Sequence, residues 1–199
     1  MMIGAWAAKQ FVTEYLEQDL PERVQDYRNL LQLDDDRLAV PTVYHNFEPA
    51  SLLNGTDDFP VCYTVITSTR GLERVDYDGN LDPHYRVAYA ARTYVWDLQP
   101  SEAEVTESRD TLLMVVRTAL LDHQCLLHAD NLHREVKIDE GTMIEEYSDI
   151  DAAKAQMWRA GAYVAYDITL NEKVTRRSLG TVDNIRVEAS NWALLMPDS

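Results

Sequence analysis

The sequence predicts an α+β fold in which helices pack on one face of a mainly antiparallel β-sheet. Residues 84–96 and 158–170 alternate between two faces over lengths that suit strands crossing a whole sheet. Residues 3–18 and 101–122 instead place apolar side chains at helical spacing. Short connections join the strand-like segments, and such connections favour hairpins and therefore antiparallel neighbours.

The first helical pattern, residues 3–18, continues as an apolar stripe to Leu31. Asp19 is placed to cap a new helix, and Pro21 would lie in its first turn. The pattern therefore fits either two helices or one helix kinked at Pro21. The acidic run at 34–36 opposes a helix dipole, so the helical segment should end there.

The segment at 101–122 has the strongest helix start in the chain. Ser101 can cap the helix, and Glu104, three residues later, can bond back to it, which is the capping-box pattern. A wide apolar face follows, and Arg109 and Arg117 lie outside it. We expect this helix to lie over the sheet.

Shorter β-rich segments complete the predicted sheet. Residues 40–47 and 61–67 are expected as strands, and a polar loop at 76–83 precedes the long strand at 84–96. Residues 136–147 fit a strand or a hairpin that turns at Glu140-Gly141. Trp96 and Trp158, at strand ends, are expected in the core.

We expect residues 1–170 to form a single domain and residues 171–199 a C-terminal extension. The extension has a possible strand at 181–187 and could serve as an arm between subunits. A chain of 199 residues with 46% hydrophobic residues suits one domain with a real core.

Net charge restricts the classes of partner. At −16 the chain is a poor candidate for wrapping nucleic acid, since phosphate affinity needs clustered lysine and arginine. The charge suits solubility, which is the more general explanation, and also a surface that must not adhere to DNA.

Two cysteines give no disulfide framework, which suggests a reducing compartment. The first residues lack a signal-peptide pattern, and no apolar run is long enough for a membrane span.

One cluster has residue types that could bind zinc: His123, Cys125, His128 and His133. It is short, it follows a helix end, and the residues between look like core and connector. The simpler interpretation is a histidine favoured near a helix C-terminus, a buried cysteine and exposed polar residues. We therefore expect no metal and no cofactor.

The sequence does not predict an enzyme. It has no nucleophile elbow, no phosphate-binding loop and no dinucleotide fingerprint. Its many paired carboxylates lack histidine or lysine partners and fit solvated loops in an acidic chain.

Two features near the C-terminus are candidate contacts with a neighbouring subunit. Arg176 and Arg177 form a local basic patch that could pair with an acidic neighbour or simply be surface charge. Trp192 lies in an apolar segment and could pack on its own domain or anchor in a neighbour.

The order of elements resembles the tail terminator, or tail completion, family of long-tailed bacteriophages. The similarity covers about residues 3–170 as a pattern of elements. It is carried by the helix reaching Leu20-Pro21, the strand at Val61-Cys62-Tyr63-Thr64-Val65, the strand from Tyr85-Arg86-Val87 to Val95-Trp96, the helix from Ser101-Glu102-Ala103 through Val116-Arg117-Thr118-Ala119-Leu120, and the final strand after Trp158-Arg159. The segment from Pro21 to Val40 is longer and more helical than the family pattern, and residues after Asn171 have no counterpart in it.

The resemblance implies a structural virion protein of the tail and neck, assembled in the host cytoplasm. Such proteins form a homohexameric ring that caps the tail tube, stops its growth and takes part in head–tail joining through the connector, or stopper, protein. DNA would pass through the lumen without specific binding, and no membrane would be involved.

Three alternatives stay open at this point. The chain could be another neck or minor tail protein of a phage. It could be a small metal-dependent enzyme that uses the histidine and cysteine cluster. It could also be an adaptor domain that acts as a monomer, with its C-terminal segment packed on itself.

Overall fold

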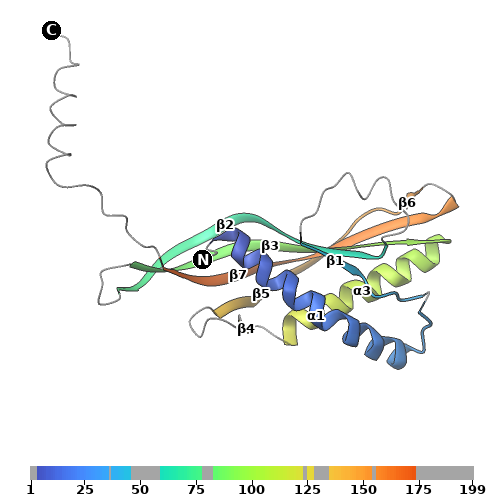
Figure 1. The fold of residues 1–199 in the computed structure, drawn as a ribbon. Coiled ribbons are helices and arrows are strands. Elements are labelled where there is room, and N and C mark those ends of the chain that lie inside the picture. Colours follow the sequence, from blue (N-terminus) through green and yellow to red (C-terminus); the bar gives the residue numbers. More distant parts are fainter. Residues whose placement is uncertain are drawn as a thin grey trace, which may run out of the picture.

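The computed structural model describes residues 4–35, 37–45, 59–77, 83–122, 125–127, 135–153 and 156–173. Their elements are α1 (Ala5–Leu31), β1 (Thr42–Tyr44), β2 (Val61–Tyr77), β3 (Pro83–Gln99), α3 (Glu102–Asp122), β4 (Cys125–Leu127), β5 (Glu135–Tyr147), β6 (Asp151–Ala152) and β7 (Trp158–Lys173). The predicted α+β class is confirmed, because both helices lie on one face of a seven-stranded sheet (Figure 1).

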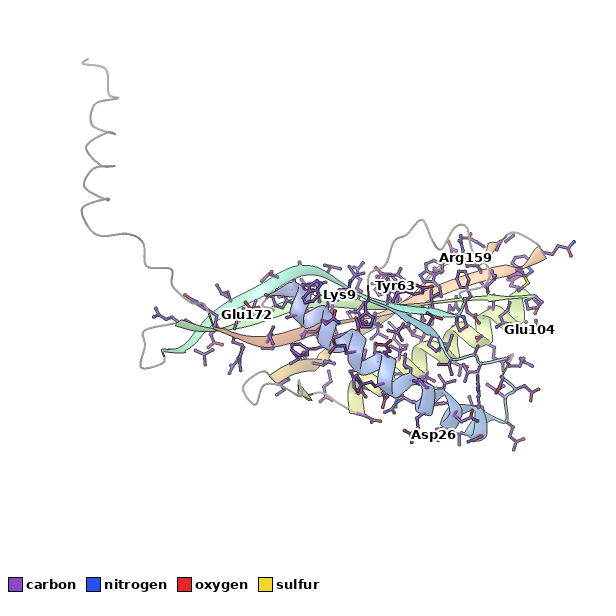
Figure 2. All side chains as sticks on the ribbon, viewed as in Figure 1. Lys9, Asp26, Tyr63, Glu104, Arg159 and Glu172 are labelled. Atoms are coloured by element: carbon purple, nitrogen blue, oxygen red, sulfur yellow. The ribbon has the colours of Figure 1, made fainter. Side chains whose placement is uncertain are left out.

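The strand order is β1-β2-β3-β7-β5-β4, and β6 pairs with the start of β7. All neighbouring strands are antiparallel except β1 and β2, which run parallel. The predicted, mainly antiparallel sheet is therefore confirmed. The molecule is elongated along its long strands, and Glu172 of β7 and Glu104 of α3 lie near its opposite ends (Figure 2).

A single helix, α1, runs through Pro21, so the two-helix alternative is wrong. Asp19 does not cap a helix; its carboxylate instead accepts a hydrogen bond from Arg23 one turn later, at 2.6 Å. The helix ends at Gln32, whose backbone is left-handed, shortly before the acidic run. The apolar stripe also stops early, because Leu30 and Leu31 are exposed to solvent.

The Ser101 cap predicted at the start of α3 is confirmed, and Glu104 contacts it through the Ser101 hydroxyl. The Ser101 hydroxyl accepts a hydrogen bond from the Glu104 backbone N–H at 3.2 Å and donates to the Glu104 carboxylate at 2.7 Å. The prediction that Arg109 lies outside the apolar stripe is wrong, because it is buried on the same helix face, one turn after Val105. Its guanidinium stacks over the Tyr147 ring and donates to the Ser148 carbonyl oxygen at 3.2 Å.

The strands differ from prediction at three points. β2 does not end at residue 67 but continues to Tyr77. β5 is one strand with a register shift between Asp139 and Ile144, so the hairpin alternative is wrong. Trp96 and Trp158 are half-buried and lie outside the main core.

The core lies between the two helices and the sheet face they cover. It includes Leu16, Leu20, Leu112, Leu113 and Leu120 from the helices, and Val95, Val164, Tyr166 and Ile168 from the sheet. The alternation predicted for residues 84–96 is confirmed, since Val87, Tyr89, Ala91, Thr93 and Val95 are all buried. Most of the loop predicted after residue 47, the turn at 78–80 and the possible strand at 181–187 lie outside the described residues.

Candidate interaction surface

The predicted metal cluster cannot be placed as a group. His123, His128 and His133 lie outside the described residues, and only the backbone of Cys125 is described, in β4. Within the ranges that are described, no group of three or more histidine, cysteine, aspartate or glutamate residues is arranged to hold a metal ion. The zinc hypothesis and the expectation of no metal both stay predictions.

The predicted subunit contacts also fall beyond the described residues. Arg176, Arg177 and Trp192 follow the end of β7 at Lys173. Candidate surfaces must therefore come from the sheet and the helices.

Cys62 is sealed in the core and is not a nucleophile. Its side chain has no solvent exposure, and burial raises the pKa of the thiol to about 12. At neutral pH the thiol is therefore protonated, and a thiolate is the form that attacks.

The sheet face opposite the helices has a row of three tyrosines across β2, β3 and β7. Tyr63 and Tyr94 are register partners with rings stacked 5.0 Å apart, and Tyr163 lies 4.9 Å beyond Tyr94. The Arg92 guanidinium lies 4.7 Å from the centre of the Tyr163 ring. Offset rings and a cation over a ring face both stabilise such a row. The row combines aromatic faces with hydroxyl groups, so it is amphipathic.

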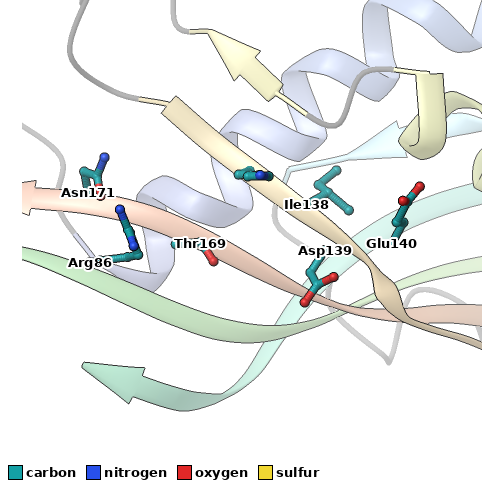
Figure 3. A pocket seen from close by; sticks show the side chains of 7 residues that line it. Arg86, Ile138, Asp139, Glu140, Thr169 and Asn171 are labelled. Atoms are coloured by element: carbon teal, nitrogen blue, oxygen red, sulfur yellow. The ribbon is translucent and has the colours of Figure 1, made fainter. Parts of the chain in front are cut away.

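Further along the same sheet, a hollow of about 570 Å³ lies over β3, β5 and β7 (Figure 3). Its charged lining residues are mixed in sign, with Arg86 and Lys137 against Asp139 and Glu140. Its remaining lining residues are Ile138, Thr169 and Asn171. None of its lining residues is a histidine, a cysteine or a serine.

The β2 segment Thr67–Val75, which we call the β2 edge segment, is exposed on both of its faces. It belongs to a continuous strand with register shifts, and every one of its residues is exposed. Leu72 is 67% exposed and Val75 is 48% exposed. The hairpin end of β2 and β3 extends past the N-terminal end of α1 (Figure 1). Apolar side chains on an uncovered strand are typical of a surface that meets another molecule.

A second group of exposed apolar side chains lies around the C-terminal end of α1. Leu30 is 74% exposed, and Leu31 and Val40 are more than a third exposed. This group and the hairpin end lie toward opposite ends of the elongated molecule (Figure 1).

Sequence reasoning missed the β2 edge segment, because polar residues and Gly71 interrupt its β-rich pattern. One signal could have found it. Partners in an antiparallel hairpin lie about equally far from the turn, so a strand paired along the whole of 84–96 is about as long as that strand. The long strand at 84–96 therefore implied a longer β2.

No model of a known protein family matches the chain, and a search of curated proteins finds no similar sequence. In the part of the chain that the structure covers, no helix combines the length and apolar character needed to cross a membrane.

Proposed function

We propose that this chain is the subunit of a phage tail terminator ring that caps the tail tube, stops its growth and joins it to the head–tail connector. The observation that carries the proposal is the β2 edge segment, an ordered strand exposed on both faces. In a monomer, exposure of Leu72 and Val75 on an edge strand contributes no stability and favours unwanted association. A ring subunit instead buries such a strand against its neighbour.

The exposed apolar groups at the two ends suit a ring between two different partners. A terminator has one surface toward the tail tube and another toward the connector. Leu72 near one end and Leu30 near the other supply apolar contacts for two separate surfaces.

The net charge of −16 supports the same function. DNA passes through the lumen of such a ring, and an acidic wall repels it and keeps it from adhering. The proposal needs no cofactor and places the protein in the tail of the virion.

The experiment is tail-tube growth with the tube protein of the same phage, followed by electron microscopy. The chain added during growth should shorten the tubes and appear as a ring at one end. The double variant Leu72→Asp/Val75→Asp should lose this effect while keeping its helical circular dichroism spectrum. Tubes that grow to the same length with and without the chain would contradict the proposal.

A further inference from the structure

We propose that the β2 edge segment of one copy pairs antiparallel with the outer edge of β5, Ile138–Tyr147, in the next copy. Neighbouring sheets would then join head to tail into one continuous sheet around the ring. This inference rests on the proposed function and names the contact between its subunits.

Both edges are open where the contact is placed. β2 pairs with β3 along one side, and β1 covers its other side only over Val61–Tyr63. β5 pairs with β7 along one side, and β4 covers its other side only over Glu135–Lys137. Among the described strands nothing else pairs with these two sides. An open strand edge presents a row of backbone N–H and C=O groups that can pair with another strand.

Strand directions fit the proposed pairing. β2, β3, β7 and β5 lie side by side and alternate in direction, so β2 and β5 of one copy run in opposite directions. Within one copy the registers place Ser68 level with Asp139, so the strands must be inclined to the ring axis for Thr67–Val75 to reach Ile138–Tyr147 of the next copy. A rotation about such an axis leaves the two edges antiparallel. Two different edges of the same chain make a heterologous contact, and such contacts generate closed rings when the rotation closes.

The charges of the two edges are complementary. The β2 edge segment has two arginines, Arg70 and Arg74, and one glutamate, Glu73, for a net charge of +1 in a chain of −16. Ile138–Tyr147 has four acidic residues and no basic residue, for a net charge of −4. Opposite potentials favour this pairing, and the acidic β5 edge repels a second β5 edge.

The backbone of the β2 edge segment is accessible to a second strand. The segment contains no proline, so every residue keeps its N–H. A Cβ atom built on Gly71 would meet nothing within 4 Å. Pairing of β2 with β3 has register shifts after Ile66, Thr69 and Arg74. Bulges and charges on an edge discourage indiscriminate pairing, so they restrict this edge to a partner of matching twist and charge.

The test combines hydrogen exchange with charge reversal in the full chain. Exchange of the Thr67–Val75 amides should slow when the ring forms, because strand addition places edge amides in hydrogen bonds. Arg70→Glu/Arg74→Glu changes the segment from +1 to −3, opposite a β5 edge of −4. This variant should need about tenfold or more protein to assemble. Adding Glu140→Lys/Glu146→Lys makes the β5 edge neutral and should restore most of the assembly.

Arg70→Lys/Arg74→Lys is the matched control, since it keeps the segment at +1 and should assemble like the wild type. Assembled wild type whose Thr67–Val75 amides exchange as fast as in single chains would overturn the edge contact and leave the ring proposal standing. Slow exchange already in single chains would show that the same chain occupies the edge, and would also overturn it. Wild type that stays a single chain, even with tube ends present, would instead overturn the proposed function.

Discussion

Gly161 of β7 lies directly against the indole ring of Trp96 on β3. A Cβ atom built on Gly161 would clash with three carbons of that ring, Cδ2, Cε2 and Cε3, and the last two would lie 2.6 Å away. The two residues are register partners on the sheet face away from the helices, next to the row of tyrosines. The glycine therefore allows the indole to lie flat across the neighbouring strand, which holds this end of the sheet together.

Gly161→Ala should destabilise the fold by about 1–3 kcal/mol, because the added methyl group forces the indole or the strand to move. Urea unfolding followed by circular dichroism measures the change. The matched control is Gly71→Ala, where the methyl group meets nothing within 4 Å. That variant should be neutral or stabilise by about 0.4–1 kcal/mol through the unfolded chain. Equal effects at both glycines would contradict the close approach.

Tyr166→Phe should destabilise the fold by about 1 kcal/mol, since it removes a buried hydrogen bond. The Tyr166 hydroxyl and the Thr93 hydroxyl lie 2.7 Å apart, and Thr93 is 2.9 Å from the Thr64 hydroxyl. Burial raises the pKa of Tyr166, so its hydroxyl stays protonated and can donate. Tyr147→Phe, at an exposed tyrosine, is the control and should change the free energy of unfolding by less than about 0.5 kcal/mol.

Ser101→Ala should cost about 1 kcal/mol of stability, because the Glu104 N–H loses its cap. Ser101→Thr keeps a hydroxyl that can accept from the Glu104 N–H and donate to its carboxylate, and it should retain most of that stability. Thermal unfolding of the two variants and the wild type measures the difference. Alanine and threonine variants that unfold together would show that the cap does not stabilise α3.

Stability should fall as the pH rises above about 8.5, the ordinary pKa of a cysteine. Burial raises the pKa of Cys62 and of Tyr63 to about 12, so the folded state keeps protons that the unfolded state releases. The stabilisation is complete below the unfolded pKa values and is lost as the pH approaches about 12. Between about pH 8.5 and 10, before tyrosines ionise, Cys62→Ala should lose less stability than the wild type. Parallel urea midpoints for the two proteins over that range would contradict the role of Cys62.

Periodicity and capping were enough to predict the helices and the two long strands. The alternation of residues 84–96 and the Ser101–Glu104 pair are local signals, and the structure confirms both. Pro21 left two alternatives open, and the single helix holds because a long helix that packs through Leu20 and Val24 can tolerate a missing N–H. Glu140-Gly141 suggested a hairpin turn, but β5 continues through it as one strand. The register shift between Asp139 and Ile144 accommodates the residues that have no partner on β7.

The candidate surface was harder to predict, because it depends on pairing across the sheet. The exposure of Leu72 follows from the position of β2 at the edge, and the row of Tyr63, Tyr94 and Tyr163 follows from the register of three strands. Neither is a local property of the sequence. Arg109 was wrongly expected outside the apolar stripe, because its charge argued against burial although its spacing fits the stripe. Its burial depends on Tyr147 and Ser148, which come from a distant strand and its connector.

Assembly is the central claim, and the mass of the purified chain in solution tests it most directly. Light scattering across a concentration series, with and without tail-tube protein, should show growth from the 22.8 kDa single chain toward a closed oligomer about six times heavier. The mass should then stop increasing, because a closed ring has no free edge. A single-chain mass at every concentration, unchanged by tail tubes, would contradict the account.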